Sequence, residues 1–170
     1  MLFRSSGFFI YNNAVIFSRH PRIEAQDSDL NSKMLRDWQL DTIAFCEAVA
    51  QFNLGLAYHQ RGKYCGEDRT LLGALELYEQ CLNTLKSVQV VESEEIKVLQ
   101  LAAMNNRIHI LNEVARFPSA QVLVNDLLLG SVNALSTNEG NSLSFLTRTD
   151  IDNFLLNALV IRRFNTAPCA

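Results

Sequence analysis

Cysteine and histidine offer the widest chemistry in this sequence, because thiolates and imidazoles act as nucleophiles, bases and metal ligands. The chain has 4 cysteines and 3 histidines. No cysteines form a Cys-x-x-Cys pair, and no group of cysteines and histidines has the spacing of a zinc site. We therefore expect reduced thiols that pack as small apolar side chains, and neither a metal ion nor another cofactor. The cysteines are Cys46, Cys65, Cys81 and Cys169.

Two of the histidines, His59 and His109, lie inside predicted helices but at different positions of those helices. A shared metal ion would require the fold to bring the two helices together, and no nearby aspartate or cysteine supports it. Solvated or hydrogen-bonded imidazoles are the simpler interpretation. A cysteine nucleophile would need an activated thiol and an orienting third group, whereas Cys46 and Cys81 lie on apolar helical stripes and are expected to be buried. We predict that the protein is not an enzyme.

Length and composition indicate one helix-rich domain. The chain has 170 residues, of which 48% are hydrophobic and 19% are charged. The charged share lies below the roughly 25% usual for soluble domains, which favours a compact fold and leaves room for an apolar surface that needs a partner. The formal net charge is -3, and no basic run occurs. A nucleic-acid partner is therefore not expected.

The beginning of the chain could pass for a secretory signal. Residues 1–4 carry a basic side chain and precede an apolar stretch over residues 8–17. However, Asn12 and Asn13 interrupt the stretch, and no small-residue cleavage site follows before residue 20. No stretch approaches the roughly 20 apolar residues of a membrane span. We expect an intracellular, cytoplasmic protein without a membrane partner.

The spacing of apolar residues predicts four helices between two loops. Gly62 is expected to end the first helix, and a polar break over residues 63–70 to precede the second. Residues 18–38 and 136–144 are rich in polar and turn-forming residues and are predicted to be loops. The helices are expected at about residues 40–60, 70–87, 93–114 and 118–134.

The two terminal apolar segments are predicted to be strands. Residues 8–17 are rich in aromatic and β-branched side chains, and residues 154–161 form an apolar run too short for an ordinary helix. We expect them to pair as an antiparallel ribbon that packs beside the helices, since such a ribbon alone is marginal in water. A helix remains the alternative, because Gly7, Tyr11 and Ala14 also have helical spacing.

A repeat signature occupies the first two predicted helices. A degenerate second copy begins at Asn106, 53 positions after Asn53, with Ile108 in the place of Gly55. The signature residues of the first copy are Asn53, Leu54, Gly55, Tyr58, Gly62, Tyr64, Ala74, Tyr78 and Cys81. Their counterparts in the second copy are Asn106, Leu111, Ala115, Phe117, Ala120, Val124 and Leu127.

This pattern resembles the tetratricopeptide repeat, although both linkers are longer than the family's 34-residue spacing allows. The chain as a whole also resembles tetratricopeptide-like proteins abundant in diatoms, a resemblance that implies no activity. It implies a single mainly α domain over residues 1–170, with helix hairpins at about 40–87 and 93–135 and the terminal segments 8–17 and 154–161 as caps.

The family pattern has a physical basis in side-chain size. Small residues at Gly55, Ala74 and Cys81 would let two antiparallel helices approach, while Tyr58 and Tyr78 would fill the wedge between hairpins. One hairpin alone leaves an apolar face bare, so a neighbour must stack on it. We therefore expect Gly55 to lie against the helix that carries Ala74.

The resemblance implies a concave face built from the first helix of each hairpin, which suits an extended peptide or a helix as ligand. The function it implies is a non-catalytic binding module or scaffold for a protein or peptide. The alternatives are a structural protein that self-associates and, less favoured, a cysteine–histidine enzyme. A carboxylate clamp is not expected, because the basic residues it needs are missing. The groove candidates are Phe52, Leu56, His59, Gln60, Asn105, His109, Asn112 and Glu113.

Overall fold

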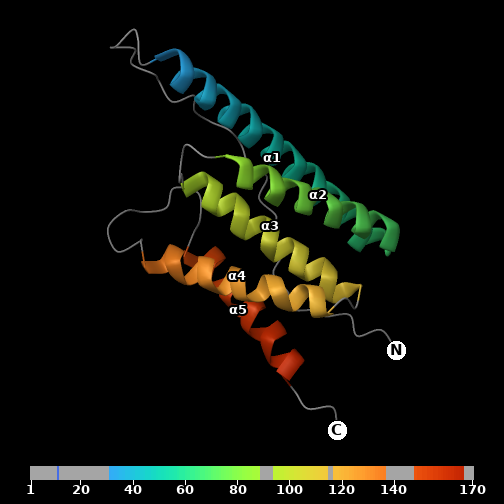
Figure 1. Ribbon diagram of the computed structural model, residues 1–170. Helices are drawn as coiled ribbons and strands as arrows, with labels where there is room; N and C mark the ends of the chain where they lie inside the picture. Colours follow the sequence, from blue (N-terminus) through green and yellow to red (C-terminus); the bar gives the residue numbers. More distant parts are fainter. Residues whose placement is uncertain (1–10, 12–30, 89–93, 115–116, 137–147, 167–170) are drawn as a thin grey trace.

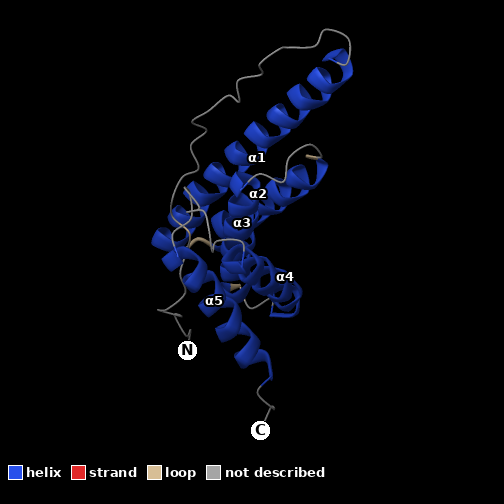
Figure 2. Ribbon diagram, turned by 90° about the vertical axis from the view of Figure 1, so that its left-hand side faces the viewer, coloured by secondary structure: helices blue, strands red, loops and turns tan. Residues whose placement is uncertain are grey.

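The computed structural model describes residues 11, 31–88, 94–114, 117–136 and 148–166. Successive helices pack on one another in alternating directions, and α3 also contacts α1 and α5 (Figure 1). Within the described ranges the chain forms helices and short connections without any strand (Figure 2). The predicted mainly α class is therefore confirmed. The helices are α1 (Asn31–Cys65), α2 (Asp68–Ser87), α3 (Glu94–Glu113), α4 (Phe117–Ser136) and α5 (Arg148–Thr166).

The first helix, α1, is longer at both ends than the sequence pattern predicts. It begins at Asn31, so the prediction of a loop over residues 18–38 is wrong for residues 31–38. Gly62 does not end it either. The helix ends at Cys65, before Gly66, whose φ of 68° is the left-handed conformation that glycine adopts most easily.

The end of α1 has the hydrogen bond of a Schellman motif. The Glu67 N–H donates to the Gly62 carbonyl over 3.0 Å, which is the bond that this motif makes across a left-handed glycine. The Glu67 carbonyl then accepts from the N–H groups of Thr70 and Leu71 at the start of α2. The connection between α1 and α2 is therefore two residues long, and not the eight-residue break over 63–70 that we predicted.

The last helix corrects the strand prediction for residues 154–161, which lie inside α5. Ile151, Phe154 and Ala158 are all fully buried, and their spacing of three and four residues is that of one helical face. The polar residues before the apolar run belong to the helix, with Asp150 in its first turn. Of the other predicted strand, only Tyr11 is described, and it lies outside any strand. The rest of 8–17, and the ribbon with it, fall outside the described residues.

The remaining boundaries lie near their predicted positions, because each of these helices has apolar residues at helical spacing. The second, α2, buries a face that includes Leu71, Ala74, Tyr78 and Leu85. The third, α3, lies between the other helices and buries successive residues such as Leu101, Ala102 and Ala103 around its circumference. Polar side chains of α3 are therefore buried as well and need internal partners.

Glycines allow α1 and α2 to approach closely. A Cβ on Gly55 would lie 3.1 Å from Tyr78 Cε1 and 3.3 Å from Leu77 Cβ, so Gly55 lies against the helix that carries Ala74, as expected. A Cβ on Gly62 would lie 2.9 Å from Leu71 Cγ and 3.0 Å from the Leu71 backbone nitrogen. The absence of a side chain at Gly62 thus serves helix contact, not helix termination.

We expect Gly62→Ala to lower the free energy of unfolding by up to about 2 kcal/mol. Overpacking against the α2 backbone costs about 1–3 kcal/mol, and the better helix propensity of alanine offsets about 1 kcal/mol of it. The matched control is Gly73→Ala, whose Cβ would meet only the exposed ring of Tyr58, at 3.3 Å. This change should raise stability by about 0.5–1 kcal/mol. Urea unfolding followed by circular dichroism measures both, and two changes of the same sign would contradict the tight contact.

Candidate functional site

Asn106 of α3 holds the backbone of Tyr11 through both of its polar groups. The Tyr11 N–H donates to Asn106 Oδ1 over 2.9 Å, and Asn106 Nδ2 donates to the Tyr11 carbonyl over 3.1 Å. A side-chain amide carries one acceptor and two donors in one plane, so it can satisfy both backbone groups of a single residue. Asn106 therefore contacts Tyr11 as a neighbouring strand would.

The ring of Tyr11 lies among aromatic side chains from three helices. Its centroid is 6.3 Å from that of Phe52 of α1 and 5.8 Å from that of Phe154 of α5. Phe52 in turn lies 5.6 Å from Tyr78 of α2, and all these rings are tilted relative to one another. Tilted pairs at such distances are favourable contacts. The result is an aromatic pocket, lined by Phe52, Tyr78 and Phe154, in which Tyr11 is only 3% exposed.

Further amides connect this pocket to α5. Asn157 Nδ2 donates to Asn105 Oδ1 over 2.8 Å, and Asn105 Nδ2 donates to Asn106 Oδ1 over 3.2 Å. Asn106 Nδ2 also donates to the Tyr78 hydroxyl over 3.2 Å. A buried polar side chain without partners destabilises a fold, so these bonds explain how a core can hold three asparagines.

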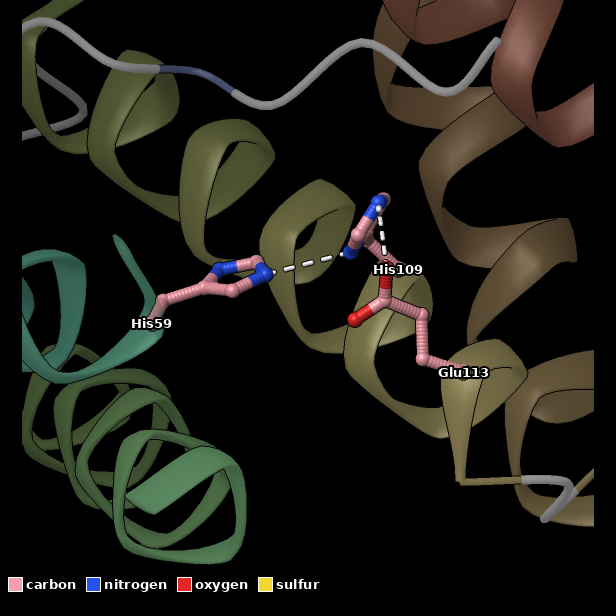
Figure 3. Close-up of side chains that lie close together, drawn as sticks. All are labelled: His59, His109 and Glu113. Atoms are coloured by element: carbon pink, nitrogen blue, oxygen red, sulfur yellow. Dashed lines mark hydrogen bonds and ion pairs between the residues drawn. The ribbon is translucent and has the colours of Figure 1, made fainter. Parts of the chain in front are cut away.

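The two helical histidines meet on the other side of Tyr78. His59 Nε2 of α1 lies 3.1 Å from His109 Nδ1 of α3, and His59 Nδ1 lies 3.4 Å from the Tyr78 hydroxyl. Glu113 follows His109 by one helical turn, and its Oε1 lies 3.6 Å from His109 Nε2 (Figure 3). The condition that a shared site would require, namely that the fold brings His59 and His109 together, is therefore met.

Burial determines the charge of these groups. It lowers the pKa of His59 to about 3, and the neighbouring His109 and Lys63 act in the same direction. Burial, followed by the charge of Lys63, lowers the pKa of His109 to about 4. Partial burial raises the pKa of Glu113, an effect that Lys63 opposes. Both imidazoles are therefore neutral at neutral pH, and each keeps a lone pair on one ring nitrogen.

The eight groove candidates fall into two groups. Gln60 is exposed, and Asn112 and Glu113 are half-buried. The other five are buried within the core and take part in the contacts described above or in the packing around them. They are Phe52, Leu56, His59, Asn105 and His109. A partner can contact these five residues only if the group that covers them moves away. At Phe52 the covering groups include Tyr11.

Sequence reasoning did not place Tyr11, Asn106, Phe154 or Asn157 in the candidate site. The signal for Asn157 was present, since it is an amide inside an otherwise apolar run. Such a residue is either exposed or bonded to another buried polar group. Tyr78 is fully buried, as its expected position between hairpins requires, whereas Tyr58 is 44% exposed and fills no such wedge.

Of the described cysteines, one is buried and two are exposed. Cys81 is buried, as predicted, and burial raises the pKa of its thiol to about 12, so it stays protonated at neutral pH. The prediction that Cys46 is buried is wrong, because its position on α1 faces solvent. Cys65 is exposed as well, and Cys169 lies outside the described residues.

Comparison with protein-family models, curated proteins and solved structures gave no match. Among the described helices, none is both long enough and apolar enough to cross a membrane.

Proposed function

We propose that the protein is a non-catalytic module that binds a partner protein through a short extended segment carrying an aromatic side chain. The observation that carries this proposal is the pair of hydrogen bonds between the Asn106 amide and the backbone of Tyr11. Backbone pairing gives affinity for any extended chain, and a pocket for one side chain gives specificity. This division of roles is typical of peptide-binding surfaces.

The aromatic pocket sets the chemistry of the partner. Phe52 and Phe154 contact the Tyr11 ring, and Tyr78 supports Phe52 from behind. These ring contacts favour tyrosine or phenylalanine in the partner segment. The amides of Asn105 and Asn106 are neutral, so the partner needs no charge at this position. A protein or peptide remains the expected partner.

Tyr11 itself would compete with such a partner. Because it belongs to the same chain, it competes as a tethered ligand, whose effective concentration at the pocket can exceed that of a free partner. A partner segment of equal intrinsic affinity would therefore bind weakly while Tyr11 is in place. Removing the Tyr11 ring should make the pocket accessible.

We expect Tyr11→Ala to raise the affinity for a synthetic peptide of residues 8–14, Phe-Phe-Ile-Tyr-Asn-Asn-Ala, by about tenfold or more. Fluorescence anisotropy with a labelled peptide measures the affinity, and the melting temperature of the variant should rise when the peptide is present. The matched control is Tyr58→Ala, which removes an exposed tyrosine from α1 and should leave the affinity unchanged.

Two results would count against this function. One is a folded Tyr11→Ala protein that binds the peptide no better than the parent protein does. The other is equal binding of a peptide in which alanine replaces the tyrosine, because the aromatic pocket would then contribute nothing to recognition.

A further inference from the structure

We propose that His59, His109 and Glu113 form a binding site for a divalent transition-metal ion, with Zn²⁺ as the ion that fits best. One potential ligand atom from each of the three residues lies within 4.8 Å of the others. Figure 3 shows the two imidazole rings and the Glu113 carboxylate converging from α1 and α3. The site includes neither Tyr11 nor Asn106 and does not depend on peptide binding.

The separation of the two imidazole nitrogens suits a shared ion. An ion with Zn–N distances of about 2.0–2.1 Å and tetrahedral angles holds its two nitrogens roughly 3.3 Å apart. His59 Nε2 and His109 Nδ1 already lie 3.1 Å apart. The separation of the two nitrogens therefore needs little change, but both rings must tilt so that their lone pairs point to a common ion beside the present hydrogen bond.

The proton between the rings has another position available. Without an ion, the Tyr78 hydroxyl can donate a hydrogen bond to His59 Nδ1. The N–H at His59 Nε2 can then donate to His109 Nδ1. When an ion binds His59 Nε2, the proton of that nitrogen moves to Nδ1, and the Tyr78 hydroxyl, which donated to Nδ1 before, turns its hydrogen away and accepts from Nδ1–H. No net proton is released. The Tyr78 hydroxyl then holds the ring in place, as outer hydrogen-bond partners of metal-bound histidines usually do.

Helix geometry supplies the third ligand. His109 and Glu113 are four residues apart on α3, so they occupy one face of the helix. The Glu113 side chain is 23% exposed, in contrast to the buried histidines, and it connects the site to solvent. A water molecule can complete a four-coordinate shell from that side, as in zinc sites with three protein ligands.

Ligand chemistry selects the class of metal. Two imidazoles and one carboxylate suit Zn²⁺ and its transition-metal neighbours, whereas Mg²⁺ and Ca²⁺ prefer sites built from oxygen atoms alone. The nearby charge of Lys63 opposes a cation, but this side chain is exposed and its field is screened by solvent.

The test is isothermal titration of chelator-treated, tag-free protein with Zn²⁺. Because the exposed thiols of Cys46 and Cys65 also bind zinc, the parent for this test carries Cys46→Ser and Cys65→Ser. Cys169→Ser is added, because this residue lies outside the described ranges. We expect one ion per chain, a melting temperature that rises with Zn²⁺ concentration, and a visible absorption band of four-coordinate Co²⁺ when cobalt replaces zinc.

The test variants change half-buried or exposed residues, so they should not disturb the fold. Glu113→Gln should weaken Zn²⁺ binding by about tenfold or more, since changing even an outer hydrogen-bond partner of a metal ligand costs about 10–100-fold. Lys63→Gln should strengthen binding by about two- to threefold, because it removes a repelling charge. Glu76→Gln, an exposed glutamate of α2, should leave binding unchanged.

Three outcomes would overturn the proposal. The parent protein could bind no Zn²⁺ at any concentration tested, in which case the histidines form only a hydrogen-bonded pair. Glu113→Gln could bind as tightly as Glu76→Gln, which would place the ion elsewhere. Binding could also appear without a Co²⁺ band, which would indicate a loosely held surface ion.

Discussion

Phe52→Ala is expected to lower the free energy of unfolding by about 3–5 kcal/mol, the range found when a buried phenylalanine is truncated. Phe52 is fully buried, and its ring contacts those of Tyr11 and Tyr78. Alanine would remove these contacts and leave a cavity between α1, α2 and Tyr11, since neighbouring rings held in a packed core cannot collapse fully into the space.

The matched control for Phe52→Ala is Leu54→Ala, two residues along the same helix. Leu54 is 49% exposed, so its truncation should change stability by about 0.5 kcal/mol or less. Urea unfolding followed by circular dichroism compares the two variants. If Phe52→Ala were as mild as Leu54→Ala, the described packing of the aromatic pocket would be wrong.

The expected loss also changes how the peptide groove can be tested. Phe52 and His109 were groove candidates from the repeat resemblance, yet both are buried, and truncating either one removes core contacts. A loss of partner binding after such changes would not distinguish recognition from unfolding. The affinity of Tyr11→Ala for an added peptide avoids this ambiguity, because the expected result is a gain of affinity, which unfolding would not produce.

The helices could be predicted where one face carries a continuous apolar stripe. In α2, Leu71, Ala74 and Tyr78 recur at helical spacing, and the predicted range of 70–87 differs from the observed helix by two residues at its start. The spacing of apolar residues is enough to predict this helix, because a helix that is buried on one side carries its apolar face in its own sequence.

The last helix could not be predicted in the same way. An apolar run of eight residues is compatible with strand or helix, and only burial decides between them. Phe154 and Ala158 are buried while Leu156 is exposed, which is a helical pattern that emerges only when the neighbouring helices are known. The exposed leucines Leu156 and Leu159 are as apolar as the buried residues, so the sequence does not show which face of the run is buried.

The histidine pair shows why the candidate site was harder to predict than its helices. His59 lies six residues after Asn53 and His109 three residues after Asn106, so the repeat alignment sets them one turn apart. Three residues correspond to about 4.5 Å along a helix axis, a distance that two imidazole side chains can span. Alignment of the two copies therefore separated residues that the packing of α1 and α3 brings within 3.1 Å.

Asn106 shows the same limit at longer range. It pairs with Tyr11, which is 95 positions away in the sequence. The sequence around Asn106 does not show that Tyr11 is its partner, because the backbone N–H and carbonyl of many other residues could form the same hydrogen bonds with the amide. A buried asparagine predicts that a partner exists, and only the fold identifies it.

Asn106→Leu should lower the free energy of unfolding by about 2–4 kcal/mol. Leucine has a similar volume but cannot accept from the Tyr11 N–H or donate to the Tyr11 carbonyl and the Tyr78 hydroxyl. Each buried group left without a partner costs about 1–3 kcal/mol, part of which the added apolar contact of leucine offsets. Asn125→Leu, at an exposed position of α4, is the control and should be close to neutral.

Hydrogen exchange separates the specific role of Asn106 from a general loss of stability. The amide proton of Tyr11 donates to Asn106 Oδ1, so it should exchange slowly in the parent protein and rapidly in Asn106→Leu. Amides in the middle of α2 should stay protected in both proteins, because their bonds lie within the helix. Equal exchange at Tyr11 in the two proteins would show that Asn106 does not hold this backbone, and the proposed recognition of an extended segment would lose its basis.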